Sequence, residues 1–258
     1  MKDMQNQPDF RNIPIDKVGI KGLKYPVVVR DKAKGSQSTV AEINMYVDLP
    51  HQCKGTHMSR FVELLHTVNT PVSPESLTSI LDDMKASLGA KSAHIEISFP
   101  YFIEKNAPST QSKGLMDYNC TIIGSSGDRK TADMVLKVAV PVTSVCPCSK
   151  EISDHGAHNQ RGEVRVAVRC HKFIWIEEIV NLVEQAASCD IYSVLKRADE
   201  KYVTEKGYNN PKFVEDIVRD VAKALIEDAN ITWFSVSAEN FESIHNHSAY
   251  AWIEHSRA

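Results

Sequence analysis

Residues 73–101 read SPESLTSILDDMKASLGAKSAHIEISFPY, and within them the period of the apolar side chains changes from helical to extended. Ser73 and Pro74 are typical of a helix N-cap and first turn, and Gly89 is typical of a helix end. The apolar face of this helix comprises Leu77, Ile80, Leu81 and Met84. Residues 93–101 alternate with period two, which predicts a strand. A helix followed directly by a strand is the pattern with which the rest of the chain can be compared.

The segments on either side complete a first group of elements. Residues 39–49 predict a strand with one slipped position, its apolar side chains being Val40, Ile43, Met45 and Val47. Residues 58–68 have helical apolar spacing, and residues 115–124 predict a returning strand. Residues 1–38 are expected to form an irregular N-terminal lead-in, because their prolines argue against helix.

The second half of the chain repeats this order. Strands are expected at residues 132–145 and 162–170, helices at 174–187 and 211–229, and closing strands at 231–238 and 249–254. Two halves that each read strand–strand–helix–helix–strand–strand predict an α+β fold of two similar modules rather than a βαβ alternation. The turn-rich residues 125–129 mark the boundary, so the first module is expected at residues 39–128 and the second at residues 129–258.

Composition and charge limit the classes of function. The chain has 258 residues, 42% hydrophobic and 24% charged, which suits a globular protein with one large core or two small ones. A formal charge of −3 disfavours a nucleic-acid-coating role. The N-terminus lacks the apolar segment of a signal peptide, and the apolar stretches are too short to cross a bilayer. We therefore expect a cytoplasmic protein that binds neither nucleic acid nor membrane.

The densest group of reactive side chains lies at residues 145–161, VCPCSKEISDHGAHNQR. If the preceding strand continues through Cys146 and Cys148, the two thiols point to the same side. With His155 and His158 they form a C-x-C and an H-x-x-H, which differ from the C-x-x-C pairs of structural zinc sites. Spacing alone leaves two interpretations open. One is a metal or nucleophile site, in which a cysteine, a histidine and a carboxylate would suit hydrolysis. The other is a pair of idle thiols near two exposed histidines.

A second polar group lies on a loop between two predicted strands. Residues 239–247, ENFESIHNH, include Glu242, His245 and His247. Histidine titrates near neutral pH, so the loop could carry general acid and base catalysts. Without further context, a polar surface hairpin is the favoured interpretation.

Three further features are explained by ordinary helix chemistry. Glu200 alone is typical of a solvated helix residue, and Glu215 of a first-turn residue that faces the helix dipole. Residues 54–60, KGTHMSR, lead into a helix whose amides could bind phosphate with help from His57 and Arg60. On spacing alone, a simple helix start is favoured there. Neither GxGxxG nor GxxxxGK(S/T) occurs, which removes the simplest dinucleotide and P-loop interpretations.

Several long motifs occur together and in a fixed order. They are DFRNIPIDKVGIKGLKYPVVV, KGTHMSRFVELL, CPCSKEISDHGAHNQRGEV, LKRADEKYVTEKGYNNPKFVED and FESIHNHSAYA. Together they closely resemble the prokaryotic type IB GTP cyclohydrolases, over residues 9–252. The resemblance implies the tunnelling fold (T-fold), with two such modules in one chain and a homotetramer around a central tunnel. It also implies conversion of GTP and water to 7,8-dihydroneopterin triphosphate and formate, the first step of tetrahydrofolate and pterin synthesis.

The resemblance also assigns roles to residues. It implies one divalent metal per site, zinc or manganese with iron as a further candidate, held by Cys146, His158 and Glu200. It implies that Glu215 binds the guanine edge, whose N1–H and N2–H₂ can both donate to a carboxylate. The surrounding catalytic and substrate-contacting groups would be Cys148, Glu242, His245 and His247. A weaker assignment gives the triphosphate to His57, Ser59 and Arg60.

Two other functions compete with this one. The NADPH-dependent 7-cyano-7-deazaguanine reductase of queuosine synthesis is also a T-fold enzyme with a cysteine nucleophile. It would need a lysine-rich motif, and the nearest text here, PESLTS, lacks the lysines. The other competitor is a non-catalytic, metal-stabilised oligomeric scaffold, which would unfold when the metal is removed.

Overall fold

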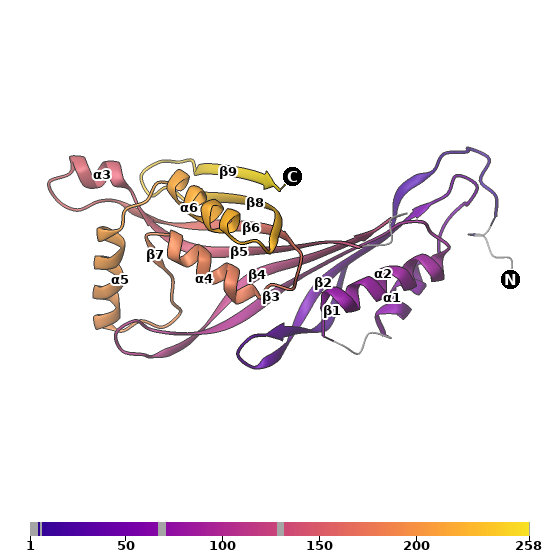
Figure 1. The fold of residues 1–258 in the computed structure, drawn as a ribbon, viewed down its shortest axis with the longest axis horizontal. Helices are drawn as coiled ribbons and strands as arrows, with labels where there is room; N and C mark the ends of the chain where they lie inside the picture. The colour runs from indigo at the N-terminus through magenta and orange to yellow at the C-terminus, as the bar shows by residue number, and fades with distance from the viewer. Residues whose placement is uncertain (1–4, 6, 67–70, 128–131, 258) are drawn as a thin grey trace. The chain divides into compact units, whose positions relative to one another are not determined.

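The computed structural model describes residue 5 and residues 7–66, 71–127 and 132–257. These residues form an α+β protein with six helices and nine strands (Figure 1), which confirms the predicted fold class. The first half contains β1 (Ile15–Asp31), β2 (Gly35–Leu49), α1 (Met58–His66), α2 (Pro74–Leu88), β3 (Ala93–Asn106) and β4 (Lys113–Ser126). The second half contains β5 (Asp133–Val145), α3 (Pro147–Ile152), β6 (Asn159–Cys170), α4 (Ile176–Ala186), β7 (Cys189–Asp190), α5 (Arg197–Asn209), α6 (Val214–Glu227), β8 (Ile231–Asn240) and β9 (Ala249–Ser256).

The strands follow one another in the order β1-β2-β3-β4-β5-β6-β8-β9, with the short β7 paired to β5. The pairings of β1 with β2, β2 with β3, β5 with β6, β6 with β8 and β8 with β9 are antiparallel. Strands β1 and β9 stand at the two ends of this order. Among the described residues, neither has a named strand on its outer edge, and Val72 forms an isolated bridge with Val29 on that edge of β1.

The chain divides into two compact units. The first consists of Met1–Phe99 and Thr121–Val135, and the second of Pro100–Cys120 and Leu136–Ala258. Strands β3, β4 and β5 each contribute residues to both units. The expected module limits, residues 39–128 and 129–258, are a different division of the chain and stay a prediction.

In the first unit, α1 and α2 pack on each other, α1 contacts β1 and α2 contacts β2 (Figure 1). The predicted apolar face of α2 is buried, and so are Ile43, Met45 and Val47 of β2. The Ser73 hydroxyl accepts a hydrogen bond from the Ser76 amide at 3.2 Å, which confirms the N-cap. Gly89 ends the helix with a φ of 63°, a left-handed conformation that glycine adopts at little cost.

The core of the second unit lies between the sheet and two helices. Helix α6 contacts α4, β8 and β9. Alternate residues of β5 and β6 point into this core, so Val164, Val166 and Val168 are all buried, as their period-two spacing predicts. Each fully buried valine of this kind stabilises the fold by about 1.5–3 kcal/mol relative to an exposed one. The four strands and two helices predicted between residues 132 and 254 are confirmed, and the unit has three further elements that were not predicted, α3, β7 and α5.

The expectation of an irregular lead-in over residues 1–38 is wrong where β2 begins, at residues 35–38, and it is wrong for residues 15–31. They form β1, which pairs along its length with β2. Pro26 lies opposite Val40 in this pairing. The proline is tolerated because β1 stands at the end of the strand order, where an amide is not needed on the outer side.

Some sequence predictions fall outside the described residues. The last two positions of the helix expected at residues 58–68 are among them, and so are residues 128–129 of the expected module boundary. Within the described part of the chain, none of the helices is both long and apolar enough to span a membrane.

Candidate functional site

Cys146 and His158 lie next to each other at the end of the β5–β6 ladder. The last register pair of that ladder is Val145 opposite Asn159, and the Cys146 amide then donates to the His158 carbonyl at 3.1 Å. The two residues are twelve positions apart in the sequence, and this backbone pairing brings them together. Two of the three predicted metal ligands are therefore neighbours in the fold.

The strand does not continue through the two thiols. Cys146 instead caps α3, and its sulfur accepts from the Ser149 amide at 3.5 Å, with Pro147 in the first helical position. The conditional expectation that Cys146 and Cys148 share one face of a strand is therefore wrong. Proline at the first helical position and a side-chain acceptor at the cap favour this turn into helix. Cys148 lies in the first turn of α3 and is exposed.

Ser149 ties the two halves of this turn together. Its hydroxyl donates to the Cys146 carbonyl at 3.1 Å and accepts from the His158 amide at 3.2 Å. This serine was not among the residues predicted from the sequence. Pro147, a residue type common at the first position of a helix, is the signal that could have identified it, because Ser149 lies in the helical turn that Pro147 begins.

His158 also has a fixed side-chain environment. Its Nδ1 lies 3.0 Å from Oε1 of Gln160 and 3.9 Å from a carboxylate oxygen of Glu242. The Gln160 amide nitrogen donates to Ser144 Oγ at 3.0 Å and lies 3.4 Å from Oε1 of Glu242. Gln160 was missed by the sequence analysis, although residues two apart on a strand share a face.

Close approach of β8 to β6 places Glu242 beside His158. Asn240 is paired with Gly162, and the Phe241 amide donates to the Arg161 carbonyl at 2.9 Å. A Cβ at residue 162 would lie 2.5 Å from Oδ1 of Asn240 and 3.0 Å from a backbone oxygen, so glycine is needed for this approach. The first residues of the β8–β9 loop are therefore held against the start of β6.

The two loop histidines are exposed. The rings of His245 and His247 stack on each other, with centroids 5.1 Å apart and an interplanar angle of 18°. They share a loop with Glu242, as predicted. Their part in proton transfer stays a prediction.

Glu200 and Glu215 lie in the first turns of α5 and α6 and are exposed. Across the described residues, no set of three or more His, Cys, Asp and Glu side chains is arranged to hold a metal ion. The structure thus brings together Cys146 and His158 but does not add Glu200 to them. The third ligand and the guanine-binding role of Glu215 stay predictions.

The residues assigned to the triphosphate belong to the first unit. His57 precedes α1, and Ser59 and Arg60 lie in its first turn. The Arg60 guanidinium donates to the carbonyl of Ser87, near the end of α2, at 2.9 Å. Their role with phosphate is untested. A cavity of about 360 Å³ in the same unit, lined in part by Lys17, contains none of the predicted site residues.

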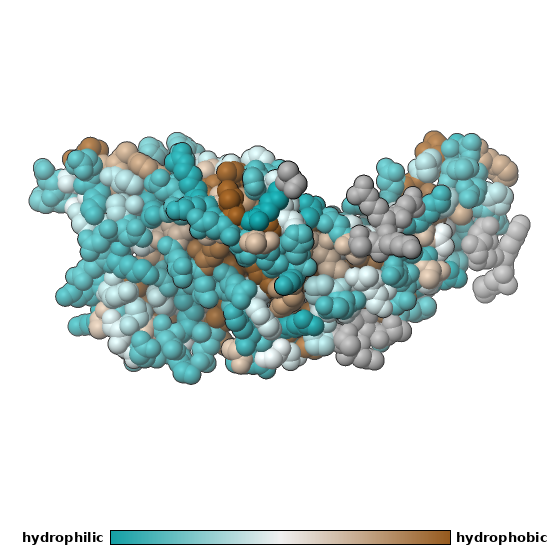
Figure 2. Space-filling view, in the orientation of Figure 1, coloured by the Kyte–Doolittle hydropathy of each residue, from teal (hydrophilic) through white to brown (hydrophobic). Residues whose placement is uncertain are grey.

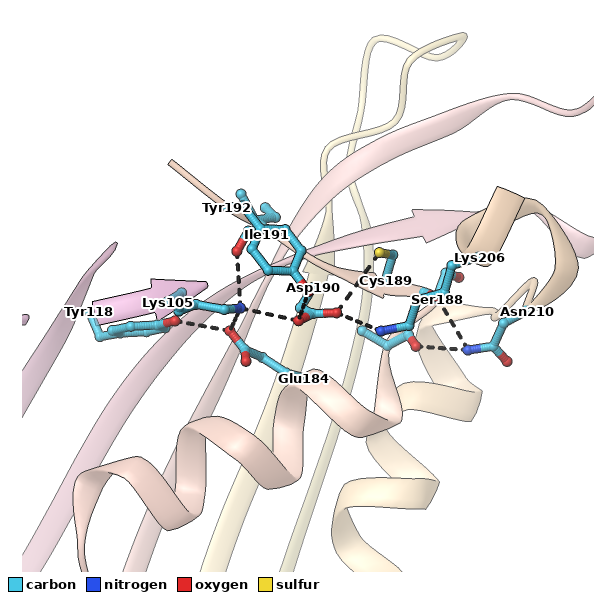
Figure 3. Close-up of polar contacts among 11 residues, drawn as sticks. Lys105, Tyr118, Glu184, Ser188, Cys189, Asp190, Ile191, Tyr192, Lys206 and Asn210 are labelled. Atoms are coloured by element: carbon cyan, nitrogen blue, oxygen red, sulfur yellow. Dashed lines mark hydrogen bonds and ion pairs between the residues drawn. The ribbon is translucent and has the colours of Figure 1, made fainter. Parts of the chain in front are cut away.

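A partly buried polar network lies in the second unit (Figure 3). Lys105 contacts Glu184 at 2.8 Å and Asp190 at 3.2 Å, and Lys206 contacts the other Asp190 oxygen at 2.7 Å. The Tyr192 hydroxyl donates to Asp190 at 2.7 Å. Two lysines face two carboxylates, so the network is balanced in charge.

The network continues to the residue before Cys146. Ser188 Oγ accepts from the Val145 amide at 3.1 Å, and the Val145 carbonyl accepts from the Lys212 amide at 3.0 Å. Asn210 donates to the carbonyls of Ala187 and Ser188. The amide and the carbonyl of Val145 therefore both form hydrogen bonds with residues outside the β5–β6 ladder.

The charges in this network shift several pKa values. Burial alone would raise the pKa of Asp190, but hydrogen bonds from Lys206 and Tyr192 and the charge of Lys105 lower it to about 2. Burial raises the pKa of Glu184, and Lys105 opposes that rise. Asp190 is therefore a carboxylate at neutral pH.

Three other cysteines are chemically quiet. Burial raises the pKa of Cys170 and Cys189 to about 11 and raises that of Cys120 still further. Each stays a protonated thiol at neutral pH and is a poor nucleophile and a poor metal ligand. Among the cysteines of the second unit, this leaves Cys146 and Cys148, at the start of α3, as the two that can take part in the site chemistry.

Comparison with solved structures identifies the fold. The uricase from Arthrobacter globiformis superposes with a TM-score of 0.55 at 8% identity, covering 94% of this chain and 93% of that one. A urate oxidase from Bacillus sp. TB-90 gives a TM-score of 0.57 at 8% identity, covering 94% and 100%. At such low identity the likeness concerns the fold alone. The chain has the tunnelling fold, as the sequence resemblance implied.

Comparison with curated proteins identifies the family. The family profile described as "Type I GTP cyclohydrolase folE2" matches residues 1–251. A protein of Desulfosudis oleivorans named GTP cyclohydrolase FolE2 is 66% identical, over 98% of this chain and 97% of its own length. One of the same name from Syntrophobacter fumaroxidans is 58% identical over the full length of both chains. With matches of this extent, this chain belongs to the type I GTP cyclohydrolase folE2 family.

Proposed function

We propose that the chain is a metal-dependent GTP cyclohydrolase that converts GTP and water to 7,8-dihydroneopterin triphosphate and formate. The reaction would be the first step of tetrahydrofolate and pterin synthesis, in the cytoplasm. The observation that carries this proposal is the Cys146–His158 pair with Glu242 beside it, in a chain of this family. Relatives at 58–66% identity bear the name GTP cyclohydrolase FolE2.

The donor set suits a divalent metal ion. Cys146 and His158 offer sulfur and nitrogen, and the Nδ1 contact to Gln160 leaves Nε2 of His158 as the nitrogen with a lone pair. Glu200 would be the third protein ligand. Sulfur and nitrogen donors favour zinc or iron, and a carboxylate also accepts manganese. When bound, such an ion supplies a water whose pKa is lowered toward neutrality.

The chain's own residues would bind GTP and move protons. Glu215 would accept hydrogen bonds from guanine N1–H and N2–H₂, a pair of donors that adenine lacks. His245 and His247 would exchange protons with the purine as its imidazole ring opens. Cys148 and Glu242 would contact the reacting part of the substrate. The assignment of the triphosphate to His57, Ser59 and Arg60 stays a prediction from the family resemblance.

The active assembly would be a homotetramer. Strand β9 stands at one end of the strand order, and an edge strand with a free outer side can pair with another chain. Tyr250 and Trp252 of β9 are exposed, at 61% and 55% of their surfaces. Aromatic residues of this kind are enriched in protein interfaces.

The test is a GTP assay on chelator-treated protein, with zinc, manganese or iron(II) added back separately. Pterin fluorescence after oxidation and released formate are measured together. Equal amounts of both products, dependent on metal, are expected. A folded protein that turns over GTP with none of the metals would overturn the proposal. Unfolding upon metal removal would point to the scaffold instead, because a catalytic site loses activity and keeps its fold.

A further inference from the structure

Gln160 lies between His158 and Glu242, and both the oxygen and the nitrogen of its side-chain amide have hydrogen-bond partners. It lies on β6 opposite Ser144 of β5, and only 7% of its surface is exposed. Its oxygen meets Nδ1 of His158 at 3.0 Å, and its nitrogen meets Ser144 Oγ at 3.0 Å and Glu242 Oε1 at 3.4 Å. A buried amide with partners on both sides has one orientation.

The carboxylate of Glu242 determines that orientation. If the amide were turned over, its oxygen would face the negative oxygen of Glu242 across 3.4 Å, and its nitrogen would face His158. Two acceptors at that distance repel each other, and at a buried position water screens the repulsion little. The arrangement with the amide N–H toward Glu242 is therefore favoured.

The amide orientation in turn selects the histidine tautomer. An amide oxygen can only accept a hydrogen bond, so Nδ1 of His158 must carry the proton. In the neutral ring the lone pair then lies on Nε2. A histidine that binds metal through Nε2 needs this tautomer, and a partner on the other nitrogen holds the ring in orientation.

We propose that Gln160 is a positioning residue that fixes His158 in its metal-binding tautomer and couples that tautomer to Glu242. The inference rests on the proposed function, because it assumes that His158 is a metal ligand. It also gives Glu242 a second role besides contact with the substrate. The carboxylate orients the amide, and through the amide it orients the ligand.

The test compares Gln160→Met with Gln160→Glu in the full-length chain. Methionine fills a similar volume but leaves Nδ1 only the more distant Ser243 hydroxyl at 3.5 Å, whereas glutamate keeps an oxygen in the place of the amide oxygen. Affinity for manganese and zinc is measured by competition with a coloured chelator, without GTP. The visible spectrum of the cobalt(II)-loaded protein reports the ligand geometry.

We expect Gln160→Met to weaken metal binding by roughly 10- to 100-fold and to alter the cobalt spectrum. Gln160→Glu should bind metal more tightly than Gln160→Met but more weakly than the unchanged protein, because its second carboxylate oxygen faces Glu242. Equal affinities in the two variants, whether both normal or both weakened, would overturn the inference, because a packing role does not distinguish an acceptor from a thioether. If Gln160→Met fails to fold, Ser144→Ala removes one partner of the amide and should give a smaller loss. Unchanged binding there would also count against the inference.

Gln37→Met is the matched control. The Gln37 amide donates to Asp31 at 2.8 Å in the first unit, so the variant removes a comparable contact away from His158. Its metal affinity should equal that of the unchanged protein. If the proposed function is wrong, the protein without substitutions should bind metal but make no pterin, and this result is measured separately. Metal binding that responds to Gln160 would then still establish the positioning role.

Discussion

Helix α6 buries six side chains against the second unit: Val214, Ile217, Val218, Val221, Ala222 and Leu225. Helix α5 precedes it in the chain and is described along its whole length, and its buried residues are Asp199 and Gly207. Each helix carries a predicted site glutamate in its first turn, Glu200 in α5 and Glu215 in α6. In Figure 2 the region of α5 is mostly hydrophilic.

Polar contacts anchor α5 at its start. Asp199 accepts from the amides of Ser109 and Thr110 at 2.8 Å each, and from the Thr110 hydroxyl at 2.6 Å. It also accepts from the Lys196 amide at 2.9 Å, which caps the helix. The loop between β3 and β4 is thereby joined to the residue next to Glu200.

A second set of contacts anchors the end of α5. Lys206 donates to Asp190, and Asn210, just past the helix, donates to the 187–188 backbone (Figure 3). A Cβ at Gly207 would lie 3.4 Å from the Val145 side chain, so the helix passes close to the residue before Cys146. The end of α5 is therefore tied to the segment that contacts the residue before Cys146, and its start is tied to the β3–β4 loop.

The difference between the helices has a physical meaning. An isolated helix of 13 residues is marginal in water, and most helices in proteins gain stability from an apolar face. Helix α6 has such a face, and its stability follows the area that it buries. Helix α5 lacks one, and its position depends on a few directional hydrogen bonds. Changes at those bonds should therefore move Glu200 while leaving the rest of the unit folded.

The largest effect should come from the apolar face of α6. Ile217 has no exposed surface, and Ile217→Ala removes buried carbon atoms and leaves a cavity. We expect the free energy of unfolding to fall by about 2–5 kcal/mol in a denaturant titration. Ile226→Ala on the same helix is the control, because Ile226 is 45% exposed and should change stability by less than about 0.5 kcal/mol. Equal losses in the two variants would show that the apolar face does not hold α6.

A smaller and more local effect is expected at Asp199. Asp199→Ala leaves the amides of Ser109 and Thr110 without their acceptor, so α5 should loosen at its start. Hydrogen exchange of the α5 amides should accelerate while that of α6 stays unchanged. If Glu200 is a ligand, metal affinity should fall on the order of tenfold.

Asp216→Ala provides a matched control for that experiment. Asp216 occupies the same place in α6 that Asp199 has in α5, and it accepts from the Phe213 amide at 3.0 Å. It is partly exposed, and the apolar face holds its helix independently. Exchange in α6 should hardly change in this variant. If it accelerates as much as α5 does in Asp199→Ala, the two helices are held in the same way.

The sequence predicts the elements of this protein well because most of them are amphipathic. The buried faces of α2, α4, α6 and β6 all follow from apolar spacing. Strand β1 was missed because Pro14 and Pro26 suggested an irregular segment, and the pattern of an edge strand is weaker when one side needs no partner. Helix α5 has no apolar periodicity, so the sequence pattern does not predict it, and only Glu200 was considered there.

The candidate site could be predicted only in part. Cys146 and His158 stand out by residue type, and the fold does bring them together. Gln160 and Asp199 are of common types, and their importance comes from burial and from partners far away in the sequence. Such contacts depend on the tertiary structure, which no local pattern encodes. The assignments of Glu200 and Glu215 depend on the family resemblance and not on local geometry.

The smallest effect is expected at the other anchor of α5, where Lys206→Met removes one cation from Asp190. The pKa of Asp190 is lowered to about 2, below its usual value of about 4, so its contribution to stability is present above pH 4 and is lost as the pH falls toward 2. Because Lys206 is partly exposed, the variant should lose only about 0.5–1 kcal/mol at neutral pH.

The pH dependence of that loss distinguishes charge from packing. Loss of the cation brings the pKa of Asp190 closer to its usual value, so the difference from the unchanged protein should shrink between pH 4 and pH 2. Urea titrations across this range measure it. Lys201→Met is the control, because that lysine is exposed and meets Glu205 at 3.8 Å on the helix surface. A loss that stays constant down to pH 2 would mean that Lys206 anchors α5 through its methylene groups. The end of α5 would then be held, like α6, by apolar contact, and only its start would depend on a carboxylate.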